Sequence, residues 1–437
     1  ITSLNTQIAI HWFRRDLRLE DNTALFHALT NNEQVLPLFI FDTEILDSLE
    51  DKADARVQFI FDTLMTIRKK LRATGNDIYI AYGSPMEVFK NLISQYTISA
   101  VYTNHDFEPY AIQRDNAIKQ FLATHNIAFK TCKDQVIFEK DEVLKDDGRP
   151  YTIYTPYSKK WKLKLTADDL VPRPSEKYLR YLYQTPPLPE IGLQQIGFLP
   201  TEMFIPVTQL NLEIVKNYHN TRDLPAVNGT TRMSVHLRFG TVSIRHLARL
   251  TQQVNEKYFN ELIWREFYQM ILAHFPHVVT KSFKPEYDRI VWRNNETEYQ
   301  SWCEGKTGFP IVDAGMRELN ATGHMHNRVR MIVSSFLTKD LLIDWRWGEA
   351  YFAKKLLDFD LASNNGGWQW AAGCGVDAAP YFRIFNPQSQ TLKFDPELKY
   401  ISHWVPELNE LSYPKPIVDH SFARDRVLKV YKAALSK

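Results

Sequence analysis

Four polar and aromatic side chains recur at helical spacing in the segment ELIWREFYQM. Glu261, Trp264, Arg265 and Tyr268 stand at positions i, i+3, i+4 and i+7, so in a helix they share one face. A carboxyl group, an indole, a guanidinium and a phenol on one face suit a flat polar ligand that lies next to phosphate. A half-buried face with an internal ion pair is the alternative interpretation.

A second unusual segment, DFDLASNNGGWQWAAG at residues 358–373, combines acids, asparagines, glycines and tryptophans. A core excludes unpaired carboxylates, and a solvated loop has little use for two indoles. The mixture therefore favours a ligand site, in which the glycines Gly366 and Gly367 let the backbone approach a ring. An irregular corner formed by these two glycines is the alternative.

Two shorter segments offer further polar groups. In HNRVRM, Asn327, Arg330 and Met331 lie within one helical turn, whereas Arg328 points aside toward a different partner. In GTTRMS, residues 229–234, hydroxyl groups surround an expected helix start, where free N–H groups suit a phosphate. Ordinary helix capping by Thr and Ser is the alternative interpretation of that start.

Tryptophan and arginine are concentrated in the second half of the chain. Eight of the ten tryptophans lie there: Trp264, Trp292, Trp302, Trp345, Trp347, Trp368, Trp370 and Trp404. The same region holds Arg222, Arg232, Arg265, Arg328, Arg330 and Arg383. Interleaved indoles and guanidinium groups are what binding of a single strand or an extruded base requires. Core packing and a solvated surface remain the alternative for each residue singly.

Composition excludes several classes of protein. A net charge of +2 over 437 residues indicates that any basic footprint is local. Three scattered cysteines without C-x-x-C spacing argue against a disulfide framework and a metal site, and favour a reducing compartment. Neither a membrane span nor a signal peptide is evident. We therefore expect a soluble, cytoplasmic protein.

The periodicity of the chain predicts two domains and a connector. Short β-branched and aromatic runs alternate with helical patterns over residues 1–134, which predicts a doubly wound, Rossmann-like α/β domain with a parallel sheet. Eight of the 22 prolines fall in residues 135–205, the predicted linker. Residues 206–437 have helical periodicity, with glycines such as Gly308, Gly323 and Gly348 expected at helix ends. No dinucleotide or triphosphate glycine fingerprint occurs.

In these segments the chain resembles the photolyase and cryptochrome family, most closely the class I cyclobutane pyrimidine dimer photolyases. The resemblance rests on HWFRRDLRLEDNTAL, GTTRMS, ELIWREFY, KTGFPIVDAGMREL, HNRVRM, DFDLASNNGGWQWAAG and PYFRIFNP, which follow in family order. It implies an all-α FAD-binding domain after the α/β domain. It also implies a lyase that uses light and fully reduced FAD to split thymine dimers flipped out of single- or double-stranded DNA.

The resemblance implies a role for individual residues. The implied flavin contacts are Tyr218, Thr230, Thr231, Arg232, Met233, Ser234, Arg330, Asp358, Phe359, Asp360 and Asn364. Asn364 is expected at flavin N5, where a neutral amide accepts a hydrogen bond and favours the reduced ring, and Arg330 is expected to pair with Asp358. Glu261, Asn327, Met331, Asn364 and Trp370 are the implied catalytic set. Trp368, Trp345 and Trp292 match an electron-transfer chain.

For DNA, the resemblance implies contacts from Arg222, Glu261, Trp264, Arg265, Tyr268, Asn327, Arg328, Arg383 and Gln390. Asn327 and Met331 stand where (6-4) photolyases place histidines, which favours the cyclobutane dimer as substrate. His324 departs from the tryptophan common in class I members, next to the flavin pocket. The protein is expected to act as a monomer without an obligate protein partner.

An antenna pigment is expected in the α/β domain. The segment NHDFEPYAIQRD resembles deazaflavin-binding members at Asp106, Glu108 and Arg114, with Arg56 assisting. It lacks the Asn-Glu pair of methenyltetrahydrofolate binders, so deazaflavin is the preferred pigment. A polar strand end is the structural alternative. Two rival functions remain at this point: a cryptochrome-like light sensor and a dark flavin oxidoreductase, the latter disfavoured by the absent glycine fingerprint.

Overall fold

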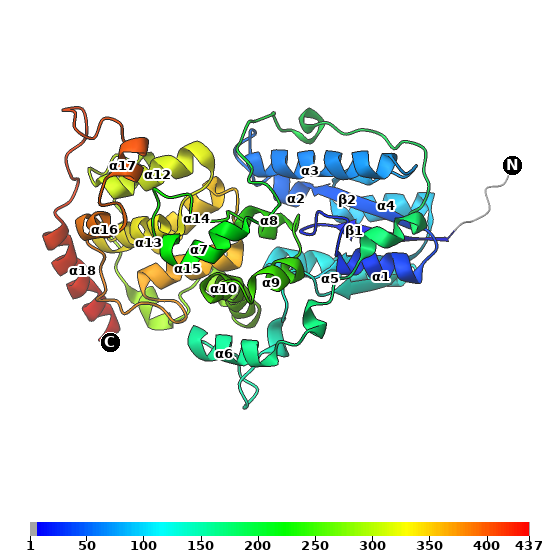
Figure 1. Ribbon diagram of the computed structural model, residues 1–437, viewed down its shortest axis with the longest axis horizontal. Helices are drawn as coiled ribbons and strands as arrows, with labels where there is room; N and C mark the ends of the chain where they lie inside the picture. Colours follow the sequence, from blue (N-terminus) through cyan, green and yellow to red (C-terminus); the bar gives the residue numbers. More distant parts are fainter. Residues whose placement is uncertain (1–6, 437) are drawn as a thin grey trace. The chain divides into compact units, whose positions relative to one another are not determined.

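A computed structural model of the chain describes residues 7–436 and divides into two compact units. Of the described residues, the sheet unit comprises 7–139, 165–209 and 233–250. The helical unit comprises 140–164, 210–232 and 251–436. The proline-rich connector is thus shared, because its α6 segment clusters with the helical unit and the rest with the sheet unit. Figure 1 draws both units, coloured along the sequence from blue through green to red.

The sheet unit is built on five parallel strands in the order β3-β2-β1-β4-β5. The strands are β1 Gln7–Phe13, β2 Val35–Asp42, β3 Tyr79–Gly83, β4 Thr97–Asn104 and β5 Ala128–Cys132. β2 is buried throughout, which explains its nearly continuous apolar sequence. The strand order reverses between β1 and β4, so the predicted doubly wound α/β fold is confirmed.

The helices of the sheet unit lie in the crossovers between its strands or follow its last strand, β5. They are α1 Thr23–Asn31, α2 Thr43–Leu46, α3 Ala55–Arg72, α4 Pro85–Gln95, α5 Pro109–Thr124, α8 Ser234–Phe239 and α9 Ile244–Thr251, with short turns η2 Asp168–Leu170, η3 Ser175–Tyr181 and η4 Leu193–Ile196. Right-handed crossovers put the helices before β4 and β5 on the same face. In agreement, α4 contacts α5.

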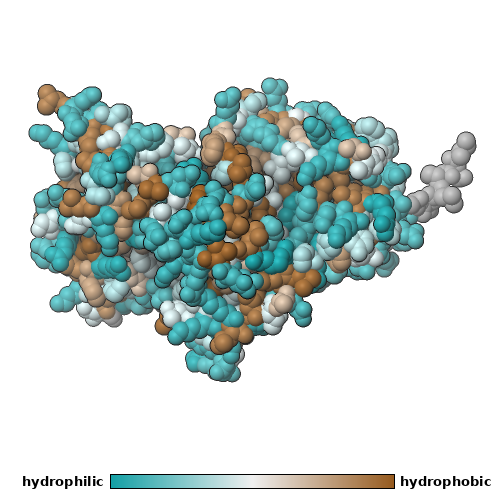
Figure 2. Space-filling model, viewed as in Figure 1, coloured by the Kyte–Doolittle hydropathy of each residue, from teal (hydrophilic) through white to brown (hydrophobic). Residues whose placement is uncertain are grey.

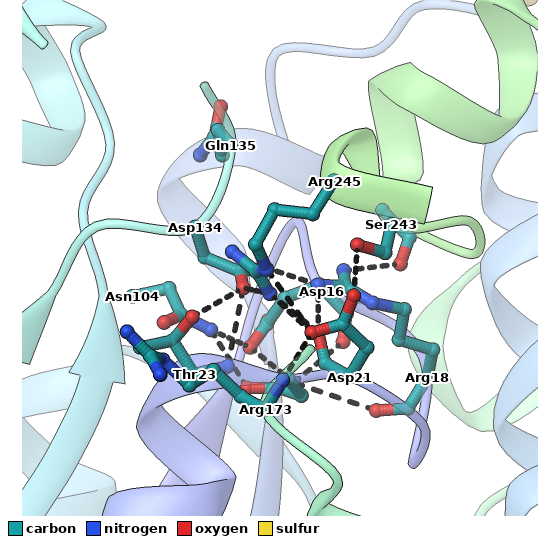
Figure 3. A network of polar contacts seen from close by, with 12 residues as sticks. Asp16, Arg18, Asp21, Thr23, Asn104, Asp134, Gln135, Arg173, Ser243 and Arg245 are labelled. Atoms are coloured by element: carbon teal, nitrogen blue, oxygen red, sulfur yellow. Dashed lines mark hydrogen bonds and ion pairs between the residues drawn. The ribbon is translucent and has the colours of Figure 1, made fainter. Parts of the chain in front are cut away.

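A buried network of charged side chains connects α9 and the loop after β1 to the segment that follows β5 (Figure 3). Asp134, which follows β5, accepts hydrogen bonds from Arg18 at 2.6 Å and from Arg245 of α9 at 2.8 Å. Burial opposes ionisation of this carboxyl group, yet the two guanidinium groups hold the pKa of Asp134 well below its usual range. The cost of burying these charges offsets much of their attraction, so the network fixes the orientation of the segments more than it adds to the free energy of unfolding.

The helical unit confirms the predicted all-α region. Its helices are α6 Tyr154–Lys164, α7 Leu212–Thr221, α10 Glu256–His274, α11 Glu296–Glu304, α12 Pro310–Thr322, α13 Asn327–Ser335, α14 Trp345–Lys355, α15 Leu361–Ala372, α16 Pro387–Phe394, α17 Lys399–Trp404 and α18 His420–Leu435. Short turns are η1 Lys140–Glu142, η5 Pro276–Val279, η6 Pro285–Arg289 and the π-helical η7 Phe336–Asp340. Its core gathers side chains from most of these helices.

Three glycines were expected at helix ends. Gly308 lies between α11 and α12, and Gly305 is the glycine that caps α11. Gly323 ends α12 with a positive φ of 65°, as predicted. Gly348 lies inside α14, so that prediction was wrong. A Cβ on Gly348 would lie 2.1 Å from the Trp368 ring, which shows that this glycine makes room for an indole.

Hydrophilic residues cover much of the face drawn in Figure 2, with apolar residues scattered among them. Among residues 7–436 no helix is long and apolar enough to cross a membrane.

Candidate flavin and lesion site

The face of α10 that was predicted from spacing centres on Glu261. Asn255 caps the start of α10 through the N–H groups of Lys257 and Tyr258. Nη1 of Arg222, at the end of α7, donates to Oε1 of Glu261 at 2.5 Å. Burial raises the pKa of Glu261, and Arg222 only partly offsets that effect. Burial thus makes Glu261 easier to protonate than a carboxyl group in water, although it is paired with Arg222.

The Arg222 pair bears on a predicted role. Arg222 was expected to contact the DNA backbone, but its guanidinium group is directed at Glu261 and stands over the ring of Tyr218, 5.5 Å from the centroid. The face of α10 is half-buried, as the alternative interpretation expected, but this ion pair joins Glu261 to Arg222 of another helix. A guanidinium that neutralises Glu261 offers less charge to a phosphate.

Aromatic rings surround Trp264 of the same helix. The ring of Tyr154 in α6 lies parallel to the indole, with centroids 3.6 Å apart and 6° between planes. Tyr268 lies 5.6 Å away on the next turn. Sequence reasoning missed Tyr154, because no spacing rule connects residues more than a hundred positions apart. Arg265, the fourth predicted member of this face, is half-buried on α10.

Residues 361–372 of the second segment form one continuous helix, α15. The irregular corner proposed as its alternative is therefore wrong. A Cβ on Gly366 would lie 2.2 Å from the Tyr268 ring, whereas Gly367 has open space around it, so close approach of the backbone to a ligand ring at Gly367 stays a prediction. Gly366 thus lets α15 pack closely on α10, which explains one of the two glycines.

Polar side chains of this segment are held in specific orientations. Nδ2 of Asn364 donates to the carbonyl oxygen of Glu349 at 3.1 Å and to its Oε1 at 2.9 Å. Both amide hydrogens are thereby used, so Oδ1 of Asn364 is the atom left to accept an N–H from a ligand. Asp360 caps α15 by accepting the N–H of Ser363 at 3.0 Å.

The predicted ion pair between Arg330 and Asp358 is present. Nη2 of Arg330 lies 2.9 Å from Oδ2 of Asp358, and its Nε donates to the carbonyl oxygen of Met325 at 2.7 Å. On the same helix, α13, Nδ2 of Asn327 is 4.0 Å from Sδ of Met331. α15 contacts both α10 and α13, so these three helices carry the predicted catalytic residues on neighbouring elements.

Two histidines precede α13. Burial, aided by nearby Arg330, lowers the pKa of His324 to about 3, and burial lowers the pKa of His326 to about 4, so both rings are neutral at pH 7. Nδ1 of His326 accepts the N–H of Arg328, which leaves the ring proton on Nε2. This buried nitrogen has no acceptor among the described residues. A bound ligand with acceptor atoms would satisfy that donor.

The three tryptophans of the expected electron-transfer chain lie in three different segments of the helical unit. Trp368 of α15 and Trp345, the first residue of α14, are almost fully buried, with 2% and 1% of their surface exposed. Gly348 of α14 leaves space for the Trp368 ring. Trp292 is partly buried, and its ring meets Tyr431 edge-on at 6.0 Å. Trp370 is half-buried on α15.

In the predicted flavin phosphate segment, the hydroxyl groups of Thr231 and Tyr258 are 2.9 Å apart, and Tyr258 packs edge-on against Tyr218. Arg232 has a positive φ of 53°. Ser234 is the exposed first residue of α8, and no side chain caps this helix, so the capping interpretation fails. Met233 is buried in the sheet unit, and Phe359 packs against the helical core.

The other residues expected to contact DNA differ in their exposure and in whether a carboxylate already pairs with them. Arg328 pairs with Asp223 at 2.7 Å and lies over the Phe394 ring. Arg383 is exposed and lies over Phe385. Gln390 is half-buried on α16. Arg383 is therefore the most accessible cation of this set.

The antenna residues lie at the carboxyl edge of the sheet. Asp106 and Glu108 both contact Arg15, at 3.4 and 2.9 Å, and Arg238 reaches Glu108 at 3.0 Å. Burial by itself would raise the pKa of Asp106, but several nearby arginines outweigh that effect and lower the pKa below its usual value. Arg15 and Arg238 were missed by sequence reasoning, although Arg15 lies in the motif HWFRRDLRLEDNTAL.

The remaining two antenna residues have their own carboxylate partners. Arg114 lies 3.1 Å from Asp115 and stands over the Trp12 ring. Arg56 pairs with Asp54 at the start of α3. Among residues 7–436 no group of three metal-ligating side chains is present.

Comparison with known proteins agrees with this geometry. Residues 9–176 match the family described as DNA photolyase, and residues 258–412 match the FAD binding domain of DNA photolyase. A deoxyribodipyrimidine photo-lyase of a Synechococcus species is 36% identical, over 98% of each chain. That of Escherichia coli is 37% identical, over 97% of this chain and 98% of the relative.

Solved structures show the same likeness. A bacterial class III photolyase from Agrobacterium tumefaciens superposes with a TM-score of 0.89 at 33% identity, covering 100% of this chain and 99% of that one. An archaeal photolyase from Sulfolobus tokodaii, solved with two FAD molecules, gives 0.82 at 34% identity, covering 98% and 100%. The fold and site thus define a flavoprotein with an FAD-binding helical unit. The chain belongs to the DNA photolyase family.

Proposed function

We propose that this photolyase splits cyclobutane pyrimidine dimers, and that α10, α13 and α15 form the lesion site. The protein is a light-dependent DNA-repair enzyme, a carbon–carbon lyase with an FAD-binding domain. The observation that carries the substrate assignment is the placement of the Glu261 carboxyl group one turn from the indole of Trp264 on α10, where burial raises its pKa. A carboxyl group next to a flat ring suits the carbonyl edge of a pyrimidine dimer.

The residues present fit reduced FAD. Oδ1 of Asn364 would accept an N–H of the flavin, the Arg330–Asp358 pair would help to hold it, and Nε2 of His326 would donate to one of its acceptor atoms. Thr230, Thr231 and Ser234 bind its phosphates, with Tyr218, Arg232, Met233, Phe359 and Asp360 completing the set. Bound at these residues, photoexcited reduced FAD would supply the electron-donor chemistry that cleavage of the dimer requires.

The protein's own residues hold the substrate. Glu261 donates a hydrogen bond to the dimer, Trp264 and Trp370 pack on its rings, and Asn327 with Met331 closes the remaining wall. Extrusion of the lesion costs a few kcal/mol and is cheapest for a damaged, poorly paired base. The DNA backbone is positioned, without its sequence being read, by Arg383, Arg328, Arg265 and Gln390. Arg222 pairs with Glu261 and stands over the Tyr218 ring.

A bound flavin would be kept reduced by electrons that an external reductant supplies at the surface and that Trp292, Trp345 and Trp368 would relay. The arginine-lined edge of the sheet at Asp106, Glu108, Arg114 and Arg56 holds a deazaflavin antenna. The Sulfolobus tokodaii photolyase holds two FAD molecules, which implies a novel light-harvesting cofactor in that protein, so a second flavin is the rival pigment. An absorption spectrum of extracted chromophores distinguishes the two pigments.

A product assay tests the main proposal. Reduced protein under near-UV or blue light should restore oligonucleotides that carry a thymine dimer and leave (6-4) lesions intact. The same mixture kept in the dark is the control. Absence of light-dependent repair by the flavin-loaded protein would rule out the dimer as substrate. Light scattering of the purified protein, with and without DNA, checks the proposed monomer.

A further inference from the structure

Trp264 has one of its two ring faces already covered. The Tyr154 ring stacks on it at 3.6 Å, close to the van der Waals limit, and with 6° between planes. Phe267 and Tyr268 meet the same indole edge-on or tilted at 5.6 Å, not face to face. Tyr154 is buried, whereas Trp264 keeps part of its surface exposed. The second face of Trp264 is consequently the one left for a ligand.

Two hydrogen bonds hold Tyr154 in this place. Its hydroxyl group donates to the carbonyl oxygen of Asn260 at 3.0 Å, one turn before Trp264 on α10. Its backbone N–H donates to Oδ2 of Asp377, in the segment after α15, at 3.2 Å. α6 is thereby joined to the helix that carries Trp264 and to the segment that follows Trp370.

Resting on the proposed function, we infer that Tyr154 is a positioning residue for the lesion site: it fixes the Trp264 indole so that one face is presented to the flipped dimer. A large ring on a helix surface otherwise loses side-chain freedom when it binds a ligand. The stack removes that freedom beforehand. With centroids 3.6 Å apart and nearly parallel planes, the two rings overlap face to face, which restricts movement of the indole.

Dark binding by the flavin-loaded protein tests this role. The measured quantity is the ratio of dissociation constants for an undamaged and a dimer-containing oligonucleotide. Tyr154→Leu removes the ring and should lower the ratio about three- to tenfold. Tyr154→Phe keeps the stack and should stay within about twofold of the original protein. Tyr157→Leu is the matched control, because Tyr157 lies on the same helix and packs on Phe267, 5.2 Å away.

A double-mutant cycle separates positioning from general loss of structure. In a Trp264→Leu background, Tyr154→Leu should leave the ratio unchanged, because its effect passes through the indole. Additive effects would overturn the inference, as would an unchanged ratio in Tyr154→Leu with full flavin content. A loss in Tyr154→Phe equal to that in Tyr154→Leu would also overturn it. If Tyr154→Leu loses FAD, Tyr154→Met replaces it with a flexible apolar side chain of similar reach.

The binding measurements distinguish a failure of the positioning role of Tyr154 from a failure of the proposed function. If the original protein shows no preference for the dimer, the proposed function itself fails. If it shows the preference and the Tyr154 variants retain it, only the positioning role fails.

Discussion

Nη2 of Arg330 lies 2.9 Å from Oδ2 of Asp358, and this pair joins α13 to the residues just before α15. Asp358 is nearly buried, with 4% of its side chain exposed, whereas 26% of Arg330 is exposed. The pair therefore presents a partly accessible guanidinium whose position is set by a buried carboxylate.

Asp358→Asn should lower both flavin content and stability. The substitution leaves the guanidinium without its counter-charge, at a cost of about 1–3 kcal/mol. The ratio of flavin to protein absorbance and the free energy of unfolding by denaturant measure the two effects. Asp425→Asn on α18 is the control for a change of charge alone. Unchanged flavin content in Asp358→Asn would contradict the role of the pair at the flavin.

Repair should depend on pH through Glu261. Its pKa is raised in the folded protein, so protonation favours the folded state, and this contribution is lost as pH rises through the raised value. Hydrogen-bond donation to the dimer should be lost in the same direction. Glu261→Gln, a permanent donor, should flatten the pH profile of repair. Glu261→Ala should reduce repair about 10- to 100-fold, the effect of losing one buried hydrogen bond. A falling profile that persists in Glu261→Gln would assign the titration to another group.

Trp292→Phe should slow the photoreduction of oxidised flavin strongly, because phenylalanine is much harder to oxidise than tryptophan. Repair by chemically reduced protein should be spared. Trp404→Phe, outside the expected chain, is the matched control. Equal losses of photoreduction and repair in Trp292→Phe would contradict the relay.

Arg383→Ala should reduce the slope of log affinity against log salt by about 0.9, the value for one phosphate contact on duplex DNA. Arg383 is exposed, with an aromatic neighbour at 5.7 Å. Arg328→Ala should change the slope less, because Asp223 already neutralises much of that charge. Titrations at several salt concentrations give both slopes. A slope unaltered in Arg383→Ala would remove it from the DNA contacts.

Gly348→Ala and Gly367→Ala should shift stability in opposite directions. A Cβ on Gly348 would meet the Trp368 ring at 2.1 Å, whereas one on Gly367 has open space within the same unit. Overpacking should cost about 1–3 kcal/mol in Gly348→Ala. Gly367→Ala should gain about 0.5–1 kcal/mol from its helical backbone. Denaturant unfolding of both variants decides the matter, and a gain in Gly348→Ala would contradict the packing of Trp368.

Sequence alone predicted the elements of this protein well. The five strands and the all-α region follow from local periodicity, because a buried parallel strand and an amphipathic helix each leave a repeat within a few residues. The face of Glu261, Trp264 and Tyr268 follows from helical spacing for the same reason. The Arg330–Asp358 pair was expected only from family resemblance, since 28 positions separate its members.

Tertiary structure decided what those elements meet. Arg222 faces Glu261 instead of lying free for phosphate, Gly348 and Gly366 make room for Trp368 and Tyr268, and Tyr154 stacks on Trp264. Each of these contacts joins segments that lie far apart in the chain. Periodicity reports only which face of an element is buried, so the partner on that face is fixed by packing in three dimensions.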